Sequence, residues 1–389
     1  MRVLFVVVPG VGHLYPLVPL AWAFRAAGHD VLVAVAEHAD RAAASGLTVV
    51  DPAPGLDLMA AMGQALRENP ELAAVVQRPM RDPADWAAHF AAVNRPLVAG
   101  AVELARRWRP DLVLFDHACT AGLIAAAAAG APAVQQILGV FRSRGLHERT
   151  AAHLADVWRP LGVTEVAPPV ATLEYMPPGM MTGEPEGRFT RFVPYTGGGV
   201  LPDWLRRRPD RPRVAVTLGT IAPQRQGIGQ LAPLVAAAAE VDAEFVLALG
   251  HLDPAPLGPL PPNVRAAGWV PLDPLLATCA AVVHHGGAST MLTAITHGVP
   301  QLVILAPGDT IRPLMGEALR RSGAGLVAGP AEVDAALIRR LLTDEGLRAA
   351  TGRVRAENLA LPTPADTVAW LEDLLVRQGT VDGSHAVLH

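Results

Sequence analysis

The stretch whose residue types say most about chemistry is His284-His285-Gly286-Gly287-Ala288-Ser289-Thr290. It follows a short apolar strand, expected over Ala280 to Val283, and opens an apolar segment that ends near Gly298. Two glycines let the backbone turn tightly and approach a ligand closely. Small hydroxyl residues then begin a helix, whose unpaired N–H groups and positive dipole end attract an anion. The pattern predicts a cradle for a diphosphate; a plain strand-to-helix turn capped by Ser or Thr is the alternative.

A zinc site at the pair His284-His285 is the other chemistry to weigh for this stretch. Adjacent residues that leave a strand point to opposite faces of the sheet. Neither a cysteine nor a third histidine lies nearby with the spacing of zinc ligands. We therefore expect no metal here.

A second loop of interest is Pro9-Gly10-Val11-Gly12-His13, which follows the apolar strand expected over Val3 to Val8. Its glycines, together with Glu37 after the next strand, raise the alternative of a nicotinamide dinucleotide site. That fingerprint needs a third glycine where this chain has Tyr15, so the match is weak. A histidine at the end of the strand indicates a different task for this loop.

Both loops need sheets to position them, and the chain provides the same pattern twice. In each half, a strand, a helix and a second strand follow one another. In the first half we expect them at Val3 to Val8, Leu17 to Ala27 and Val31 to Val35. In the second half we expect them at Val214 to Leu218, Leu231 to Glu240 and Phe245 to Leu249. Continuous apolar strands that alternate with helices are typical of parallel sheets covered on both faces. Ligands bind such sheets at the carboxyl ends of the strands, where both loops would lie.

This pattern predicts an α/β protein with two doubly wound, Rossmann-like domains that face each other across a cleft. We expect an N-terminal domain over residues 1–197 and a C-terminal domain over residues 213–361. Residues 198–212, rich in Gly, Pro and Arg, have the composition of a linker. We expect residues 362–389 to form a C-terminal helix that crosses back to the N-terminal domain, followed by a tail.

Composition excludes several classes of protein. The chain has 389 residues, of which 51% are hydrophobic and 17% charged, as expected of a globular protein with two domains. A net charge of −4 argues against nucleic acid or an anionic membrane as the main partner. Cys119 and Cys279 lie far apart in apolar segments, which suits a reducing compartment without disulfides. We expect a soluble, cytoplasmic protein that is a monomer or a homodimer.

Over nearly its whole length the sequence resembles the bacterial family 1 glycosyltransferases of the GT-B fold, which attach deoxysugars to polyketides and other natural products. It is particularly similar to the transferases of the calicheamicin (enediyne) pathway, and also to those of macrolide pathways. The motifs that carry the resemblance are Met1-Arg2-Val3-Leu4-Phe5 with Gly12-His13, Gly268-Trp269-Val270-Pro271-Leu272, the stretch His284 to Thr290, and Pro300-Gln301-Leu302.

On the acceptor side, the resemblance implies that His13 is the general base that deprotonates the acceptor. An imidazole, with an ordinary pKa near 6.5, suits that work at neutral pH. Asp116, after the strand expected over Leu112 to Phe115, resembles the acid that orients this histidine; a helix N-cap is its alternative role. The residues expected near the acceptor are Gly12, Phe141 and His147. Apolar residues between Asp51 and Arg95 would help to cover the acceptor pocket; their alternative role is to form part of the hydrophobic core.

On the donor side, the resemblance implies that Trp269 stacks on the nucleotide base and that the Val270 backbone reads the base edge. It also implies that the His284 side chain reaches the diphosphate. Asp309 would hydrogen-bond the sugar, followed by Thr310 where relatives have Gln. The remaining residues expected around the diphosphate and sugar are Gly219, Thr220, Gly286, Gly287, Ala288, Ser289 and Thr290.

The choice of nucleotide follows from one departure from the family pattern. Where relatives that use UDP-sugars carry a glutamate that binds the ribose, this chain has Leu292. An apolar side chain cannot accept a hydrogen bond from a 2′-hydroxyl. We therefore expect a preference for dTDP-sugars, whose deoxyribose lacks that group.

Taken together, the resemblance implies an inverting glycosyltransferase that needs no metal and no cofactor. It would move a deoxysugar from a dTDP-sugar to a hydroxyl of a polyketide-type aglycone, the enediynes among them. A C-glycosyltransferase on an aromatic polyketide, a non-catalytic GT-B partner protein, a dinucleotide oxidoreductase and a sugar-nucleotide epimerase are the alternatives. The sugar, the aglycone, the linkage and the oligomeric state are left open.

Overall fold

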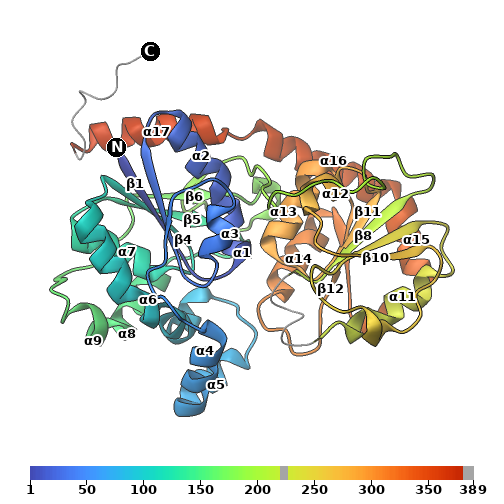
Figure 1. Ribbon diagram of the computed structural model, residues 1–389, viewed down its shortest axis with the longest axis horizontal. Coiled ribbons are helices and arrows are strands. Elements are labelled where there is room, and N and C mark those ends of the chain that lie inside the picture. Colours follow the sequence, from blue (N-terminus) through green and yellow to red (C-terminus); the bar gives the residue numbers. More distant parts are fainter. Residues whose placement is uncertain (220–226, 380–389) are drawn as a thin grey trace. The chain divides into compact units, whose positions relative to one another are not determined.

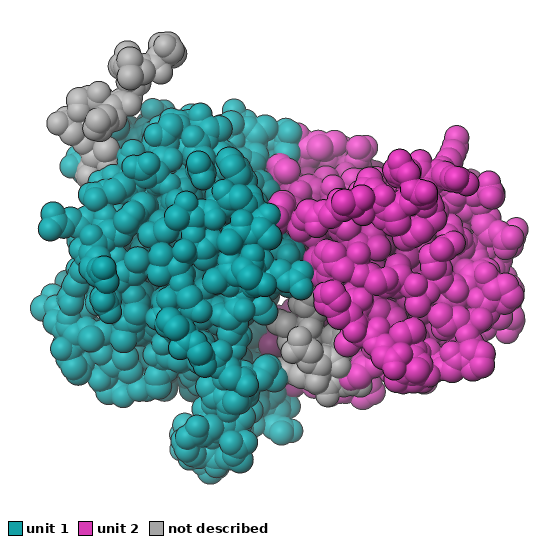
Figure 2. Space-filling model, viewed as in Figure 1, with its two compact units in different colours: residues 1–175, 183–191, 361–389 teal, residues 176–182, 192–360 magenta. Residues whose placement is uncertain are grey.

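The computed structural model describes residues 1–219 and 227–379, so the predicted donor residue Thr220 lies outside the described residues. The chain forms two compact units (Figure 2). Unit 1 comprises residues 1–175, 183–191 and those from 361 onward, and unit 2 comprises residues 176–182 and 192–360.

The segment expected to be a linker belongs to unit 2, as do residues 192–197 before it. Its packing explains this grouping. The hydroxyl of Thr196 accepts a hydrogen bond from the Asp273 amide at 3.0 Å, and Leu205 is buried in a core cluster of unit 2. Residues 176–182 are attached to the same unit, because the Met180 carbonyl accepts a hydrogen bond from Arg321 at 3.0 Å.

Unit 1 is built on a parallel sheet with the strand order β3-β2-β1-β4-β5-β6-β7. Its strands are β1 (Arg2–Val7), β2 (Asp30–Val35), β3 (Val49–Val50), β4 (Leu112–Asp116), β5 (Ala133–Ile137), β6 (Ala171–Glu174) and β7 (Arg188–Phe189). β1 is buried from Val3 onward and pairs with β2 on one side and β4 on the other. Because the strand order reverses there, the carboxyl ends of β1 and β4 form the point where ligands bind in such sheets.

Helices lie on both sides of this sheet (Figure 1). They are α1 (Val11–Leu14), α2 (Val18–Ala26), α3 (Ala39–Ala43), α4 (Leu58–Glu68), α5 (Pro70–Val76), α6 (Ala87–Trp108), α7 (Thr120–Ala129), α8 (Leu146–His153), α9 (Ala155–Trp158) and α17 (Pro364–Arg377), with 3-10 turns η1 (Tyr15–Leu17) and η2 (Pro83–Trp86). α7 packs against α6 and β4, and the last helix, α17, packs against α2.

Unit 2 has a second parallel sheet, with the order β10-β9-β8-β11-β12-β13. Its strands are β8 (Arg213–Thr217), β9 (Glu244–Ala248), β10 (Val264–Ala267), β11 (Ala281–His284), β12 (Gln301–Ile304) and β13 (Gly325–Ala328). The order reverses between β8 and β11, so the carboxyl ends of these two strands form the corresponding point of this sheet.

The helices of unit 2 cover this sheet (Figure 1). They are α11 (Ala232–Ala238), α12 (Leu272–Leu276), α13 (Ala288–His297), α14 (Pro313–Ser322), α15 (Ala335–Thr343) and α16 (Glu345–Ala360), with 3-10 turns η3 (Pro178–Met180), η4 (Gly229–Leu231), η5 (Ala255–Leu257) and η6 (Pro330–Glu332). The expected α/β class with two doubly wound domains is confirmed. Within residues 1–219 and 227–379, none of the helices is both long enough and apolar enough to cross a membrane.

Candidate active site

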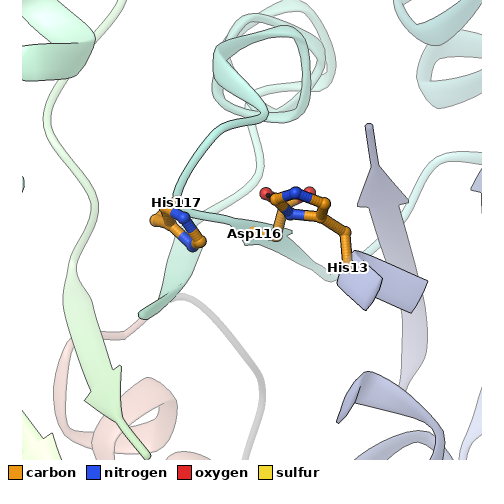
Figure 3. Close-up of side chains that lie close together, drawn as sticks. All are labelled: His13, Asp116 and His117. Carbon is orange, nitrogen blue, oxygen red and sulfur yellow. Dashed lines mark hydrogen bonds and ion pairs between the residues drawn. The ribbon is translucent and has the colours of Figure 1, made fainter. Parts of the chain in front are cut away.

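His13 and Asp116 meet at the strand-order reversal of unit 1 (Figure 3). Gly10, with a φ of 139°, turns the chain after β1 and leads into α1, which carries His13. Asp116 is the last residue of β4, the neighbour of β1 in the sheet. Nδ1 of His13 lies 3.1 Å from Oδ1 of Asp116, which leaves Nε2 as the ring nitrogen for a substrate.

The backbone holds the Asp116 carboxylate in place. Its Oδ2 accepts a hydrogen bond from the Val8 amide at 2.9 Å, and its Oδ1 accepts one from the Ala118 amide at 2.8 Å. The Asp116 side chain is fully buried, whereas 30% of the His13 side chain is exposed. The carboxylate is therefore a fixed partner, and the imidazole is the member of the pair that a substrate can reach.

Electrostatics within the pair keep Asp116 ionised and favour a proton on His13. Burial disfavours the charged imidazolium, but the charge of Asp116 and its hydrogen bond outweigh burial, so the pKa of His13 lies above the ordinary 6.5. Burial would raise the pKa of Asp116, yet its interactions with His13 hold that pKa below the ordinary 3.8. His13 is therefore the member of the pair that changes charge nearest neutral pH.

His117 is a neighbour of this pair that the sequence analysis missed. Its ring centroid lies 5.6 Å from that of His13 and 4.8 Å from that of Phe141. Only 6% of the residue is exposed, and burial lowers its pKa to about 4, so it is neutral at pH 7. The signal for it was the Asp-His dipeptide at the end of a strand.

The three predicted acceptor residues lie in different surroundings. Gly12 precedes His13 on α1, and Phe141 packs against His117, so both are close to the pair. His147 is buried instead, with Nδ1 2.9 Å from the hydroxyl of Thr120. The reason is that α8 packs on α6 and α7, which turns the first residues of α8 inward.

The predicted diphosphate turn lies at the strand-order reversal of unit 2, after β11. Gly219, with a φ of 69°, follows the neighbouring strand β8. A Cβ on Gly219 would lie 2.5 Å from Cε1 of His285, and one on Gly287 would lie 2.7 Å from its Nε2. The His285 ring therefore fills the space between two glycines, and neither position has room for a side chain.

His284 differs from the expectation that its imidazole reaches a diphosphate. The residue is 1% exposed, and both ring nitrogens have partners within the protein. Nδ1 accepts a hydrogen bond from the Gly286 amide at 3.1 Å, and Nε2 lies 2.9 Å from Oε1 of Gln301 on β12. As the last residue of β11, His284 connects the turn at Gly286 to Gln301 on β12.

The groups at this turn that have no partner within the helix are the first amides of α13. Gly287 is the N-cap, without a side-chain cap, and the first helical hydrogen bond runs from the Met291 amide to the Gly287 carbonyl at 3.0 Å. The amides of Ala288, Ser289 and Thr290 precede that bond, so they are the donors that an α-helix leaves for an anion.

The other predicted donor residues follow neighbouring strands of the same sheet. Trp269 comes after β10, is partly buried, and lies beside Gly250, which follows β9. Its neighbour Val270 packs against a core cluster of unit 2. Leu292 is completely buried on α13, so its side chain presents no atom to a bound nucleotide.

Asp309, expected to contact the sugar, is engaged within its own turn. Its Oδ1 accepts hydrogen bonds from the amides of Ile311 at 3.1 Å and Arg312 at 3.0 Å. Its Oδ2 lies 2.5 Å from Nη1 of Arg312, and 6% of its side chain is exposed. Thr310, next in the chain, is partly buried.

Comparison with known proteins shows the family. Residues 22–219 match the family described as "Erythromycin biosynthesis protein CIII-like, N-terminal domain", and residues 232–374 match the corresponding C-terminal domain. The elloramycin glycosyltransferase ElmGT of Streptomyces olivaceus is 42% identical over 375 residues, which cover 95% of this chain and 97% of that protein. The tylactone mycaminosyltransferase of Streptomyces fradiae is 39% identical, with 96% of this chain and 92% of that protein covered.

Solved structures agree with this assignment. The glycosyltransferase SnogD from Streptomyces nogalater has a TM-score of 0.82 and 40% identity, with 96% of this chain and 99% of that chain covered. The glycosyltransferase VinC, solved in complex with dTDP, has a TM-score of 0.79 and 34% identity, with 97% of this chain and 100% of that chain covered. On these matches, the chain belongs to the erythromycin CIII-like family of GT-B natural-product glycosyltransferases.

Proposed function

We propose that this glycosyltransferase moves a deoxysugar from a dTDP-sugar to a hydroxyl of a polyketide-type aglycone, with inversion at the sugar carbon. The hydrogen-bonded pair His13–Asp116 carries the proposal, since it provides a base at the carboxyl ends of β1 and β4. Two relatives named for the molecules they act on, the tylactone mycaminosyltransferase and the erythronolide mycarosyltransferase, support this class of substrate.

In this mechanism the acceptor hydroxyl gives its proton to Nε2 of His13 while its oxygen attacks the anomeric carbon. The bond from that carbon to the diphosphate oxygen breaks, and dTDP leaves with the electron pair. Asp116 holds the imidazole through Nδ1 and stabilises the imidazolium that forms. A single displacement of this kind inverts the anomeric centre.

For the leaving group, we propose that the first turn of α13 holds the diphosphate, with His284 and His285 as the supports of that turn. The amides and hydroxyls there stabilise the developing negative charge electrostatically, and no metal ion takes part. The other residues assigned to the donor are Gly219, Thr220, Trp269, Val270, Gly286, Gly287, Ala288, Ser289, Thr290, Asp309 and Thr310. On the acceptor side we assign Gly12 and Phe141.

Replacing His13 by Ala tests the base. Turnover should fall by about 10²–10⁴-fold, the usual contribution of a positioned general base. Affinity for dTDP, measured by calorimetry, should stay within about twofold of wild type, because in the proposed mechanism His13 contacts the acceptor and not the nucleotide. A His13→Ala enzyme with full turnover would refute the assignment, and NMR of the product would show inversion and an oxygen linkage.

Nucleotide preference is tested by the binding of dTDP and UDP to the wild-type protein. We expect dTDP to bind more tightly, since Leu292 stands where UDP-using relatives have an acceptor for the 2′-hydroxyl. The relatives VinC and SpnG, each solved in complex with thymidine diphosphate, support this choice. Equal or tighter binding of UDP would exclude it.

A further inference from the structure

His13, Asp116 and His117 bring three metal-ligating side chains together in unit 1 (Figure 3). Each residue offers one ligand atom, and the three atoms lie within 4.8 Å of one another. We propose that these residues form a binding site for a divalent transition metal of the class that prefers imidazole and carboxylate ligands, with Zn²⁺ as its main representative.

Two of the three ligands are held in place by the fold. The Asp116 carboxylate is fixed by the amides of Val8 and Ala118 at 2.9 and 2.8 Å. His117 is 6% exposed, and its ring packs on Phe141. Nδ1 of His117 is buried and has no hydrogen-bond partner among the described residues. A buried imidazole with an uncommitted nitrogen costs free energy that a ligand can recover.

His13 completes the site as its most exposed ligand. Its side chain is 30% exposed, which gives an ion access from solvent. Zinc binds nitrogen and oxygen at about 2.0–2.2 Å, so the ligand atoms must approach to roughly 3.3–3.5 Å in a tetrahedral site. This contraction requires movement of the ligand side chains, and the exposed side of His13 leaves the ion a position for water.

The ligand set also predicts which metal ions should not bind to the site. Mg²⁺ and Ca²⁺ prefer shells of oxygen ligands, whereas this cluster offers two imidazoles and one carboxylate. A metal bound to His13 would occupy the group that accepts the proton, so Zn²⁺ should inhibit transfer. This consequence rests on the proposed function, whereas binding of the metal does not.

Calorimetric titration of the untagged, full-length protein with Zn²⁺ and with Mg²⁺ tests the site. We expect one saturable Zn²⁺ site in the wild type and no binding of Mg²⁺. H117Q should weaken Zn²⁺ by about tenfold or more, since even loss of a group that only supports a ligand costs ~10–100-fold. The matched control is H251Q, which changes an exposed histidine and should bind Zn²⁺ like the wild type.

Absence of saturable Zn²⁺ binding in the wild type, or equal affinities in H117Q and H251Q, would overturn the proposal. Circular dichroism shows whether each variant is folded. If H117Q is not folded, the Zn²⁺ affinity of H13Q, which changes a partly exposed residue, is compared with that of H251Q instead. The two proposals fail separately. Loss of Zn²⁺ binding leaves the base role of His13 intact, whereas Zn²⁺ binding beside a fully active His13→Ala enzyme would keep the metal site and remove the base.

Discussion

In the proposed mechanism, a single carboxylate controls the proton chemistry of His13. Asp116 is ionised, fully buried and 3.1 Å from Nδ1 of His13, so it raises the pKa of the imidazole that it orients. A higher pKa makes His13 a stronger base, but it also means that more of the imidazole is already protonated at a given pH. The pair therefore makes His13 a stronger base, but it narrows the range of pH in which His13 is unprotonated and able to accept a proton.

Replacing Asp116 by Asn separates these two effects. The proposed mechanism needs neutral His13, so kcat/KM of the wild type should rise with pH through a pKa above 6.5. Without the charge of Asp116 that rise should move to lower pH, and the plateau should fall by about 10²–10⁴-fold, because the imidazolium loses its partner. Initial rates between about pH 5 and 9 measure both quantities. An unshifted rise in Asp116→Asn would show that another group titrates.

Among the elements, the turn between β11 and α13 depends on close packing more than on any one polar contact. Gly286 has a φ of 87°, a conformation that favours glycine. Gly287 has an ordinary φ of −68°, but a Cβ there would lie 2.7 Å from Nε2 of the His285 ring. A side chain at Gly287 must therefore displace that ring, and with it the first amides of α13.

The substitution Gly287→Ala should thus weaken dTDP by about tenfold or more, an effect of about 1.4 kcal/mol on binding. The matched control is Gly352→Ala on α16, where a Cβ meets nothing within 4 Å. That change should leave dTDP binding unaltered and stabilise the protein by about 0.5–1 kcal/mol, since alanine suits a helix interior better. Calorimetry and urea unfolding measure the two effects. Wild-type affinity in Gly287→Ala would place the diphosphate elsewhere.

The same turn shows what the sequence could and could not predict. The strand expected over residues 280–283 is observed as Ala281–His284, and the helix begins after the glycines as expected. Apolar runs and glycines are local signals, so they locate such elements well. The partners of the His284 side chain were not predictable in this way, because its hydrogen bond to Gln301 joins β11 to β12, 17 residues further along the chain.

Contacts between residues far apart in the sequence were predictable only where both residues follow strands that the fold places side by side. His13 and Asp116 are 103 positions apart, yet both follow strands that such folds place side by side, and they lie 3.1 Å apart. His117 directly follows Asp116, but its packing on Phe141 was not predicted, because a dipeptide at the end of a strand does not show which tertiary neighbours its side chains will contact. Tertiary packing of α8 decided the burial of His147 in the same way.

Across the whole molecule, buried histidines are a shared feature of both units. His117 and His147 in unit 1 and His284 in unit 2 are each less than 7% exposed. Burial lowers the pKa of each of them from 6.5 to about 4. They are neutral in the folded protein over a range of pH in which the unfolded chain would protonate them, so folding is linked to proton release.

The sign of this linkage predicts loss of stability in mild acid. A histidine with a lowered folded pKa contributes its full stability above the unfolded value of 6.5, and that contribution is lost as the pH falls from 6.5 towards about 4. Each such group gives a slope of about 1.4 kcal/mol per pH unit in that range. His13, whose pKa is raised, acts in the opposite direction but is a single group. Urea unfolding between about pH 8 and 5 should therefore show a free energy of unfolding that is level above pH 7 and falls steeply below about pH 6.5.

A matched pair of variants tests whether buried histidines cause this fall. His147→Gln removes one of the titrating groups and can keep the hydrogen bond to Thr120, so its slope below pH 6.5 should be smaller by about one proton. His251→Gln changes an exposed histidine and should keep the wild-type slope. The slope of the free energy of unfolding against pH is the decisive quantity, because altered packing in His147→Gln would change the stability equally at every pH and leave that slope unchanged. If both variants follow the wild-type slope, the acid sensitivity of this molecule has its origin in its carboxylates rather than in its buried imidazoles.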